Sequence, residues 1–297
     1  MPRIAITGSS GLIGSAFRAH AESAGHEIVR VRRGAPSDPA ASWDPQTGWF
    51  REGALEGVDA VVHLAGESIG DGRWSARRKQ ELVSSRIDGT RLLIDHLASL
   101  ERKPAVLVCA SAIGFYGDRG DEQLSEESSA GTGFLADLVV AWEREAARAN
   151  ELGIRTVFTR FGIVLSKEGG ALKKMLLPFK MGLGGRLGAG KNWMSYVSLP
   201  DVVGAIETAI TSDLSGPVNV TAPNPVTNAD YTKALGKAIH RPTLFPVPPF
   251  GLKLLFGAET AEELLLSSQR VNPAKLSAAG YRFHQPDIAS ALTAALR

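Results

Sequence analysis

Apolar residues along the chain gather in short runs that alternate with longer segments in which they recur every three or four positions. Arg3 to Thr7 is a short β-rich run, Leu12 to Ala24 has helical spacing, and Glu27 to Val31 has strand character again. A strand, a helix and a second strand in this order predict one βαβ unit with two parallel strands.

The same alternation continues to about residue 160. We expect further strands at 60–64, 105–109 and 154–160 and further helices at 79–100 and 133–152. Strands separated by helices imply a parallel sheet whose two faces are both covered by helices. The predicted fold class is therefore α/β, with a doubly wound parallel sheet.

The pattern changes after Val164. Seven glycines and five basic residues fall between positions 169 and 191, and prolines punctuate short segments from residue 216 onward. We expect residues 1–165, with about 197–220, to form the sheet domain, and residues 166–196 and 221–297 to form a smaller α/β domain on the substrate side. The segment 182–193 is either a mobile lid or an ordinary exposed loop.

Composition narrows the classes of function. The chain has 33 basic and 31 acidic residues and a formal net charge of +2, so no large positive field favours nucleic acid or a membrane surface as a partner. No apolar stretch reaches the roughly 18 residues that would span a bilayer, and the N-terminus lacks the features of a secretory signal. We therefore expect a cytoplasmic protein.

Cysteine and histidine add little chemistry. Cys109 is the only cysteine and lies in a predicted strand, which excludes an intrachain disulfide and fits a reducing compartment. The six histidines are scattered, without carboxylate or cysteine partners at the spacing of metal ligands, so we predict no metal.

A glycine-rich turn joins the first strand to the first helix. It reads Thr7-Gly8-Ser9-Ser10-Gly11-Leu12-Ile13-Gly14, and its glycines allow a tight turn, close approach to a pyrophosphate and free amides at a positive helix end. The alternative is a merely structural turn. Because a strand precedes the glycines and a helix follows them, we predict a dinucleotide site on a Rossmann domain.

The end of the second strand indicates which dinucleotide binds. Sites that prefer NAD usually place an acidic residue there, about 20 residues beyond the glycines, to bind the ribose 2′-hydroxyl. This chain instead has Arg32 and Arg33. A guanidinium pairs with a 2′-phosphate, so NADP(H) is predicted over NAD(H), unless both arginines simply face solvent.

Several motifs resemble those of a known family. The glycine-rich turn and His63-Leu64-Ala65-Gly66 resemble the cofactor motifs of extended short-chain dehydrogenases/reductases. Ser111-Ala112-Ile113-Gly114-Phe115-Tyr116-Gly117, Trp193-Met194-Ser195 and Pro223-Asn224-Pro225-Val226 resemble an atypical, NAD-dependent epimerase/dehydratase-like subgroup. The resemblance covers essentially the whole chain.

This resemblance implies that the cofactor lies across the carboxyl edge of the sheet and that the substrate lies between the two domains. It places His63, Leu64, Ala65, Gly66 and Arg86 beside the cofactor, and the loop after Gly162 and Ile163 near the nicotinamide. Asp44 either reaches the adenine amino group or is an ordinary turn residue before Pro45.

The usual catalytic pair of the family is missing. Relatives use a Tyr-x-x-x-Lys pair to move a proton during hydride transfer, whereas the corresponding helix here, residues 133–143, contains neither tyrosine nor lysine. The usual serine position falls on Ala112, with Ser111 as its neighbour. Candidates for the catalytic chemistry are Ser111, Tyr116 and Glu67.

Each of these candidates has an alternative. Tyr116 is a proton donor or a packing residue, because an unactivated phenol is a poor acid at neutral pH. Glu67 is an acid/base, or it forms a salt bridge with Arg73 or Arg86.

Two functions follow. The first is an NADP(H)-dependent oxidoreductase or epimerase-like enzyme acting on a small polar substrate, with anionic and nucleotide-linked compounds included. The second is a dinucleotide-binding regulator or scaffold that has lost catalysis, since some relatives carry names that imply a role in cell division. A homodimer is compatible with either.

Overall fold

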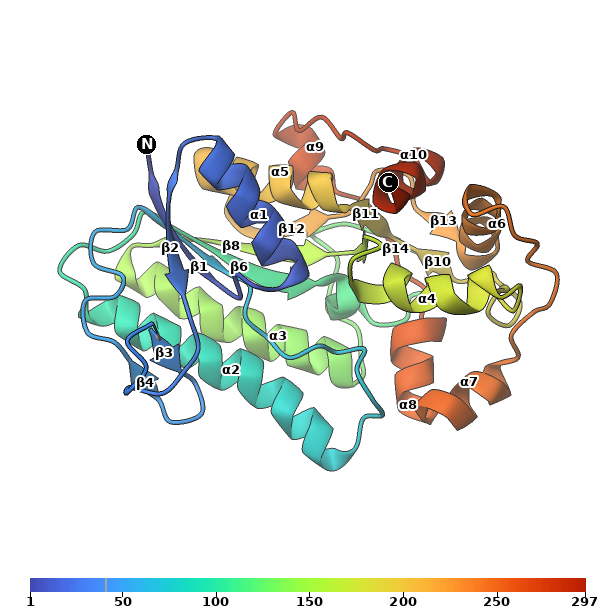
Figure 1. Ribbon diagram of the computed structural model, residues 1–297, viewed down its shortest axis with the longest axis horizontal. Coiled ribbons are helices and arrows are strands. Elements are labelled where there is room, and N and C mark those ends of the chain that lie inside the picture. Colours follow the sequence, from blue (N-terminus) through green and yellow to red (C-terminus); the bar gives the residue numbers. More distant parts are fainter. Residues whose placement is uncertain (41) are drawn as a thin grey trace.

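A six-stranded parallel sheet forms the centre of the computed structural model, which describes residues 1–40 and 42–297 (Figure 1). Every neighbouring pair of strands in it is parallel, as predicted. Across the sheet the strands are β12 (Gly216–Val220), β8 (Arg155–Phe161), β6 (Val106–Ala112), β5 (Ala60–His63), β1 (Arg3–Thr7) and β2 (Glu27–Val31).

Helices cover both faces of this sheet. One face is covered by α1 (Leu12–Ser23) and α5 (Leu199–Thr211), the other by α2 (Ala76–Ser99) and α3 (Phe134–Ala147). Alternate strand residues serve the two cores: Ile4 and Ile6 pack on the first face and Ala5 on the second. The doubly wound architecture predicted from the alternation of strands and helices is confirmed.

The strand order reverses at β1. The chain passes from β1 to β2 on one side and later returns to β5 on the other. In open α/β sheets, ligands bind beyond the carboxyl ends of the strands at such a switch point. The carboxyl ends of β1 and β5, at Thr7 and His63, are therefore the place to look for a site.

The connection from β2 to β5 contains a short hairpin of β3 (Trp43–Asp44) and β4 (Trp49–Phe50). Trp43 is buried, with its ring edge-on to the His63 ring at 6.1 Å. Two 3-10 turns, Ile113–Tyr116 after β6 and Arg148–Leu152 after α3, complete this half.

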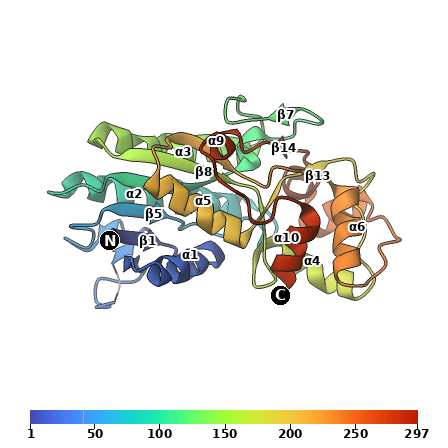
Figure 2. The ribbon, with the colours of Figure 1, turned by 90° about the horizontal axis from the view of Figure 1, so that it is seen from above.

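The C-terminal part lies beyond one end of the sheet, as Figure 2 shows for α4, α6 and α10. These helices share a core of their own, separate from the two cores of the sheet. The helices of the C-terminal part are α4 (Gly170–Lys180), α6 (Asn228–Ala238), α7 (Pro249–Phe256), α8 (Ala258–Thr260), α9 (Ala274–Ala278) and α10 (Ile288–Leu296), with a π-helical turn at Ala261–Leu266.

Three two-stranded sheets, separate from the central one, accompany this part. They pair β9 (Ile163–Leu165) with β11 (Tyr196–Ser198), β10 (Trp193–Met194) with β13 (Val226–Thr227), and β14 (Arg270–Val271) with β7 (Gln123–Leu124). On the basis of the separate core we keep the proposed division into residues 1–165 with about 197–220, and 166–196 with 221–297. Among the described residues, no helix has both the length and the apolar character needed to cross a membrane.

Candidate functional site

The glycine-rich turn after β1 fits closely against the end of β5. Gly8 has a φ of +66°, and a Cβ on it would lie 2.8 Å from the carbonyl carbon and oxygen of Leu64. A Cβ on Gly14 would lie 2.2 Å from the Gly8 carbonyl oxygen. Only glycine satisfies both positions, so the turn keeps its shape and its backbone stays accessible.

The first turn of α1 offers free amides. No side chain caps the helix, whose N-cap is Gly11, and no acidic residue lies in its first turn. The first intrahelical hydrogen bond comes from the Ser15 amide, which donates to the Gly11 carbonyl at 2.9 Å. The amides of Leu12, Ile13 and Gly14 therefore lack helical acceptors, and together with exposed Ser10 they offer hydrogen-bond donors at the positive end of the helix, which suits a phosphate.

Thr7 joins the ends of β1 and β5. Its Oγ1 accepts from the amides of Leu64 (3.1 Å) and Ala65 (3.2 Å) and lies 2.8 Å from Nδ1 of His63. With both of its lone pairs used, the Thr7 hydroxyl donates to Nδ1, so the His63 proton lies on Nε2, 3.1 Å from Oγ1 of Thr90.

This hydrogen bonding holds the loop Leu64–Ala65–Gly66 at the switch point. Complete burial lowers the pKa of His63 to about 4, so the ring is neutral at neutral pH. His63 organises the end of β5 from inside the protein and presents no surface to a ligand.

The two arginines after β2 differ in their surroundings. Arg32 is exposed, and within the described part of the chain its guanidinium has no hydrogen-bond or ion-pair partner. Arg33 Nη1 lies 3.7 Å from Oε1 of Glu67, and Arg33 is 64% exposed. Arg32 is therefore the more available cation and Arg33 is paired with Glu67, and both follow β2 at the position that contacts the 2′ substituent of a bound dinucleotide in this type of fold.

Glu67 forms ion pairs, but not those we predicted. Its carboxylate lies near Arg33 and 3.5 Å from Nη1 of Arg78. The prediction of Arg73 or Arg86 as its partner was wrong. The reason is that α2 begins at Ala76 rather than at residue 79, which places Arg78 in the first turn, facing the loop after Gly66.

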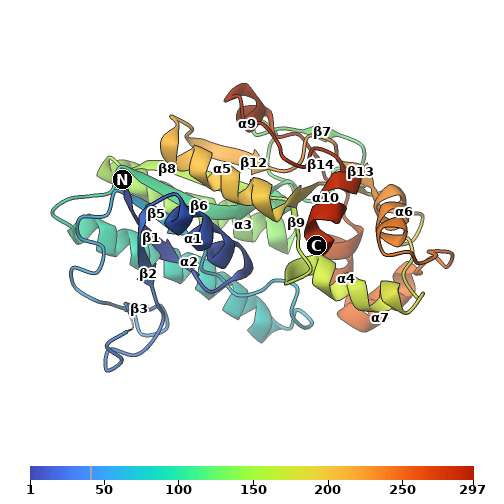
Figure 3. The same cartoon turned by 45° about the horizontal axis from the view of Figure 1, so that its top comes forward.

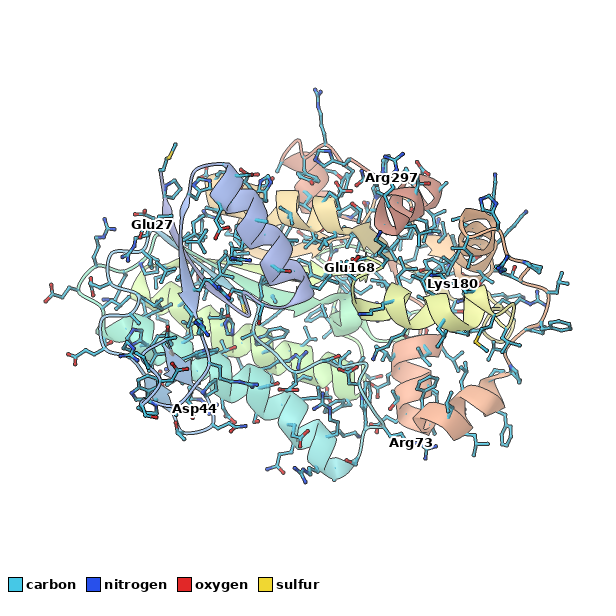
Figure 4. All side chains as sticks on the ribbon, in the orientation of Figure 1. Glu27, Asp44, Arg73, Glu168, Lys180 and Arg297 are labelled. Atoms are coloured by element: carbon cyan, nitrogen blue, oxygen red, sulfur yellow. The ribbon has the colours of Figure 1, made fainter. Side chains whose placement is uncertain are left out.

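The two arginines predicted as partners bind backbone carbonyls instead. Arg73 donates to the carbonyls of Leu254 and Leu255 at the end of α7. Figure 4 shows Arg73 on the α7 side of the molecule. Arg86 donates from Nη2 to the carbonyl of Glu67 at 3.0 Å, and its guanidinium lies 5.1 Å from the centre of the Trp142 ring.

Burial lowers the pKa of Arg86 to about 10, so it stays charged at neutral pH. Within the described residues no carboxylate is hydrogen-bonded to it. A Cβ on Gly66 would lie 3.5 Å from its Cζ. Arg86 thus places a positive charge directly behind the loop predicted to contact the cofactor.

Asp44 is engaged locally. Its carboxylate accepts from the Gln46 amide at 3.0 Å and from the Thr47 hydroxyl at 2.9 Å, an arrangement typical of a turn. A role toward adenine stays a prediction.

Gly162 and Ile163 lie where the sheet meets the C-terminal part. The Gly162 amide donates to the Val220 carbonyl at 3.0 Å, and a Cβ on Gly162 would lie 2.6 Å from the Ser195 carbonyl oxygen. Ile163 begins β9, which pairs with β11. The close approach of three backbone segments explains the glycine.

Ser111 and Tyr116 belong to one buried polar network. Ser111 Oγ donates to Oε1 of Glu143 at 2.6 Å, and Arg160 binds both oxygens of that carboxylate at 2.8 and 2.7 Å. Arg160 also donates from Nη1 to the Tyr116 hydroxyl at 3.0 Å, and that hydroxyl donates to Oδ1 of Asn219 at 2.7 Å.

The network holds the Tyr116 and Ser111 side chains in the interior of the protein. Tyr116 is fully buried, and burial raises its pKa, which favours its packing role over proton donation. Ser111 is 3% exposed. The structure brings Ser111 and Tyr116 together, whereas Glu67 is joined to Arg33 and Arg78 instead.

Sequence reasoning missed Glu143, Arg160 and Asn219. The one available signal was Arg160 itself, a charged residue inside the apolar run of β8, which requires a buried partner. Across residues 1–40 and 42–297, no three His, Cys, Asp or Glu side chains gather in a way that could hold a metal ion.

Comparison with known proteins agrees with this geometry. Residues 4–221 match the family model described as the NAD dependent epimerase/dehydratase family, and residues 247–295 match a domain of unknown function, DUF1731. Epimerase family protein Mb2239 of Mycobacterium bovis is 46% identical over 97% of this chain and 96% of its own.

Two solved structures extend the agreement. The human epimerase family protein SDR39U1, crystallised with NADPH, superposes with a TM-score of 0.87 at 29% identity over 98% of both chains. A nucleoside-diphosphate sugar epimerase from Corynebacterium glutamicum gives 0.82 at 36% identity over 99% of this chain and 58% of its own. The resemblance seen in the sequence motifs is confirmed, and the chain belongs to the NAD dependent epimerase/dehydratase family.

Proposed function

We propose that this protein is an NADP(H)-dependent oxidoreductase or epimerase-like enzyme acting on a small polar substrate. The observation that carries the cofactor part is the exposed guanidinium of Arg32 just after β2, which has no partner among the described residues and lies beside a phosphate turn with free amides. The human SDR39U1 structure, which resembles this chain over its whole length, contains NADPH. The relationship supports the same cofactor here.

The cofactor would be held by three groups of residues. Thr7, Gly8, Ser10, Gly11, Leu12, Ile13 and Gly14 would surround the pyrophosphate, Arg32 and Arg33 the 2′-phosphate, and Leu64, Ala65, Gly66 and Arg86 the neighbouring ribose. The reduced nicotinamide supplies a hydride when it is bound. Gly162 and Ile163 would lie toward the nicotinamide.

Ser111 is the group we propose to bind the substrate near the reacting carbon. Its hydroxyl hydrogen is committed to Glu143, so its oxygen can accept a hydrogen bond from a substrate hydroxyl. Because Arg160 binds both oxygens of Glu143, the carboxylate is held in one orientation and in turn fixes the Ser111 hydroxyl. Glu67, at 38% exposure, is the accessible carboxylate on the cofactor side.

A direct test is a substrate screen with bound NADPH. We expect at least one small carbonyl compound or nucleotide sugar to lower the absorbance of the reduced nicotinamide in wild type. Ser111→Ala should reduce the rate by about tenfold while leaving NADPH affinity within twofold, since the Ser111 oxygen no longer accepts a hydrogen bond from the substrate hydroxyl beside the reacting carbon. A rate unchanged by this substitution would contradict the assignment of Ser111.

The second candidate is a dinucleotide-binding regulator without catalysis. It is favoured by α3, whose first turns contain neither tyrosine nor lysine, and by the burial of Tyr116. Tight NADPH binding with no turnover on any compound in the same screen would support it over the enzyme.

A further inference from the structure

Exposed large apolar side chains gather in two segments of the C-terminal part. Among the described residues, eight such side chains come from residues 177–183 and 244–255, each 62–76% exposed. The first segment contributes Leu177, Met181 and Leu183. The second contributes Leu244, Phe245, Phe250, Leu254 and Leu255. We call these eight residues the apolar patch.

The two segments lie side by side. Val247 donates its amide to the Arg186 carbonyl at 2.8 Å and accepts from the Gly188 amide at 2.9 Å, and Arg241 Nε donates to the Lys180 carbonyl at 3.0 Å. Helix α7 follows directly. Figures 1 and 3 both place α4 and α7 at the end of the molecule away from the N-terminus. The patch therefore occupies one pole of the protein.

The two segments that carry the patch contain basic residues and no acidic ones. Residues 169–200 contain five lysines and arginines and no acidic residue, and residues 231–258 contain four and no acidic residue. The whole chain has a net charge of only +2, so the remainder is net acidic. The apolar patch thus lies in a strongly basic part of a nearly neutral protein.

Several of these cations are free to meet an external anion. Lys180, Arg186, Lys191 and Lys237 are exposed, and within the part of the chain that the structure describes none of them has a carboxylate partner. Figure 4 places Lys180 on the outer end of α4. By contrast, Lys174 and Lys253 pair with Asp71 and Glu262.

We propose that this pole docks on an anionic lipid surface. Exposed leucine, phenylalanine and methionine side chains can enter the boundary between headgroups and acyl chains, while the surrounding cations bind the lipid phosphates. Eight exposed large apolar side chains on two adjacent segments mark an interaction site. This peripheral contact goes beyond the sequence expectation of no membrane partner, which rested on the lack of a spanning segment and on the small net charge.

The charge pattern disfavours two other occupants. A second copy docking through the same face would bring two basic surfaces together, which costs free energy. The phosphates of a nucleic acid would pair with the cations, but the eight exposed apolar side chains, five of them on residues 244–255, would add little to its binding. A lipid surface uses both features.

The test is flotation of the purified protein with vesicles of equal parts phosphatidylglycerol and phosphatidylcholine, beside vesicles of phosphatidylcholine alone. We expect binding to the anionic vesicles only, weakened by added salt. Phe245→Ser/Phe250→Ser and Lys180→Glu/Arg186→Glu should each reduce binding at least about tenfold. The controls Val83→Ser/Val140→Ser and Arg77→Glu/Arg91→Glu change exposed residues of α2 and α3 in the same way and should have no effect.

The contrary results are equally defined. No binding to anionic vesicles, or binding that the control pairs reduce as much as the patch variants do, would overturn the proposal. Binding to duplex DNA that survives Phe245→Ser/Phe250→Ser, without vesicle binding, would assign the pole to nucleic acid. A dimer in sedimentation velocity that these substitutions dissociate, again without vesicle binding, would assign it to a second copy. Circular dichroism verifies that each variant is folded.

Discussion

At the carboxyl end of the sheet, two titratable side chains are buried in opposite ways. Arg160 is 3% exposed and is neutralised by a carboxylate that it binds through two nitrogens. His63 has no exposed surface and no charged partner, so it stays neutral between two threonine hydroxyls. Neither arrangement leaves an unpaired charge inside the protein, and each has a measurable consequence.

The buried His63 should make stability depend on pH. Its pKa falls from 6.5 in the unfolded chain to about 4 in the folded protein. The stability that comes from keeping His63 neutral is therefore fully present above pH 6.5 and is lost as the pH falls toward 4. Over this range the unfolded chain binds a proton on His63 that the folded protein excludes. The expected loss in the free energy of unfolding is about 3 kcal/mol.

Urea unfolding at several values between pH 7 and pH 4 measures this loss. His63→Asn removes the titrating group, so its stability should fall less steeply over the same range even if it starts lower. Parallel curves for the two proteins would show that His63 does not titrate as described.

The Arg160–Glu143 pair should be costly to break from one side. Arg160→Met leaves the Glu143 carboxylate buried with only Ser111 as its partner, and we expect a loss of about 3–5 kcal/mol in the free energy of unfolding. Arg160→Met/Glu143→Leu removes the stranded charge as well and should recover much of that loss. A double variant no more stable than the single one would mean that the carboxylate is not the source of the cost.

Gly14 is constrained by the backbone of the phosphate turn. A Cβ there would lie 2.2 Å from the Gly8 carbonyl oxygen, so Gly14→Ala should destabilise the protein by about 1–3 kcal/mol and weaken dinucleotide binding. A Cβ on Gly251, a helical glycine in α7, would lie 3.7 Å from its nearest neighbour, Cγ of Pro248. Gly251→Ala should be neutral or stabilising by up to about 1 kcal/mol. Thermal melts compare the two, and equal effects would refute the steric account.

At the scale of elements, α3 is capped from far along the chain. Its N-cap, Gly133, has no side chain, and the amides of Phe134 and Leu135 donate to the carboxylate of Glu263 at 3.0 and 2.8 Å. Leu264 packs beside Trp74 and Leu135. The C-terminal part thus fixes the start of the helix that also carries Glu143.

Loss of this cap should be visible in stability. Glu263→Ala is expected to lower the free energy of unfolding by about 1–2 kcal/mol, since two helix amides lose their acceptor. Glu262→Ala changes the neighbouring carboxylate, 57% exposed and paired with Lys253, and should stay within about 0.5 kcal/mol. If Glu262→Ala destabilised the protein as much, the helix cap would not be the explanation.

Sequence patterns predicted best the helices and strands in which apolar residues follow one regular spacing. β1, α1, β2 and β5 were expected within a residue or so of where they lie, because apolar spacing and the glycine turn define them locally. The start of α2 was placed three residues too late, because Ser75, whose side chain accepts from the Arg78 amide, was not recognised as its cap. The earlier start places Arg78 in the first turn, where it pairs with Glu67.

The parts of the site that depend on distant contacts could not be predicted. Glu263 reaches α3 from more than a hundred residues away, and Asn219 meets Tyr116 only because β12 closes the edge of the sheet. Neither residue has a local pattern that indicates its partner. The residues proposed to hold the cofactor lie together because one turn and one strand end, both defined by local patterns, place them there.

At the scale of the whole molecule, positive groups gather in two regions of the surface. The switch point between β1 and β5 has free amides, Arg32, Arg33 and the buried cation of Arg86, while acidic groups nearby are paired. The pole at α4 and α7 joins basic and apolar side chains in one surface. A single nearly neutral chain thus presents two separate anion-attracting regions, and the first is the basis of the proposed function.

The most direct test of that function is a fluorescence titration of NADPH and NADH against wild type and Arg32→Ala, with Arg18→Ala on α1 as a matched control. We predict that wild type binds NADPH at least about tenfold more tightly than NADH, because the 2′-phosphate gains a charge-assisted pair. Arg32→Ala should remove most of this preference without weakening NADH, and Arg18→Ala should keep it. Equal affinity of wild type for NADPH and NADH, or a preference that survives Arg32→Ala/Arg33→Ala, would contradict the account.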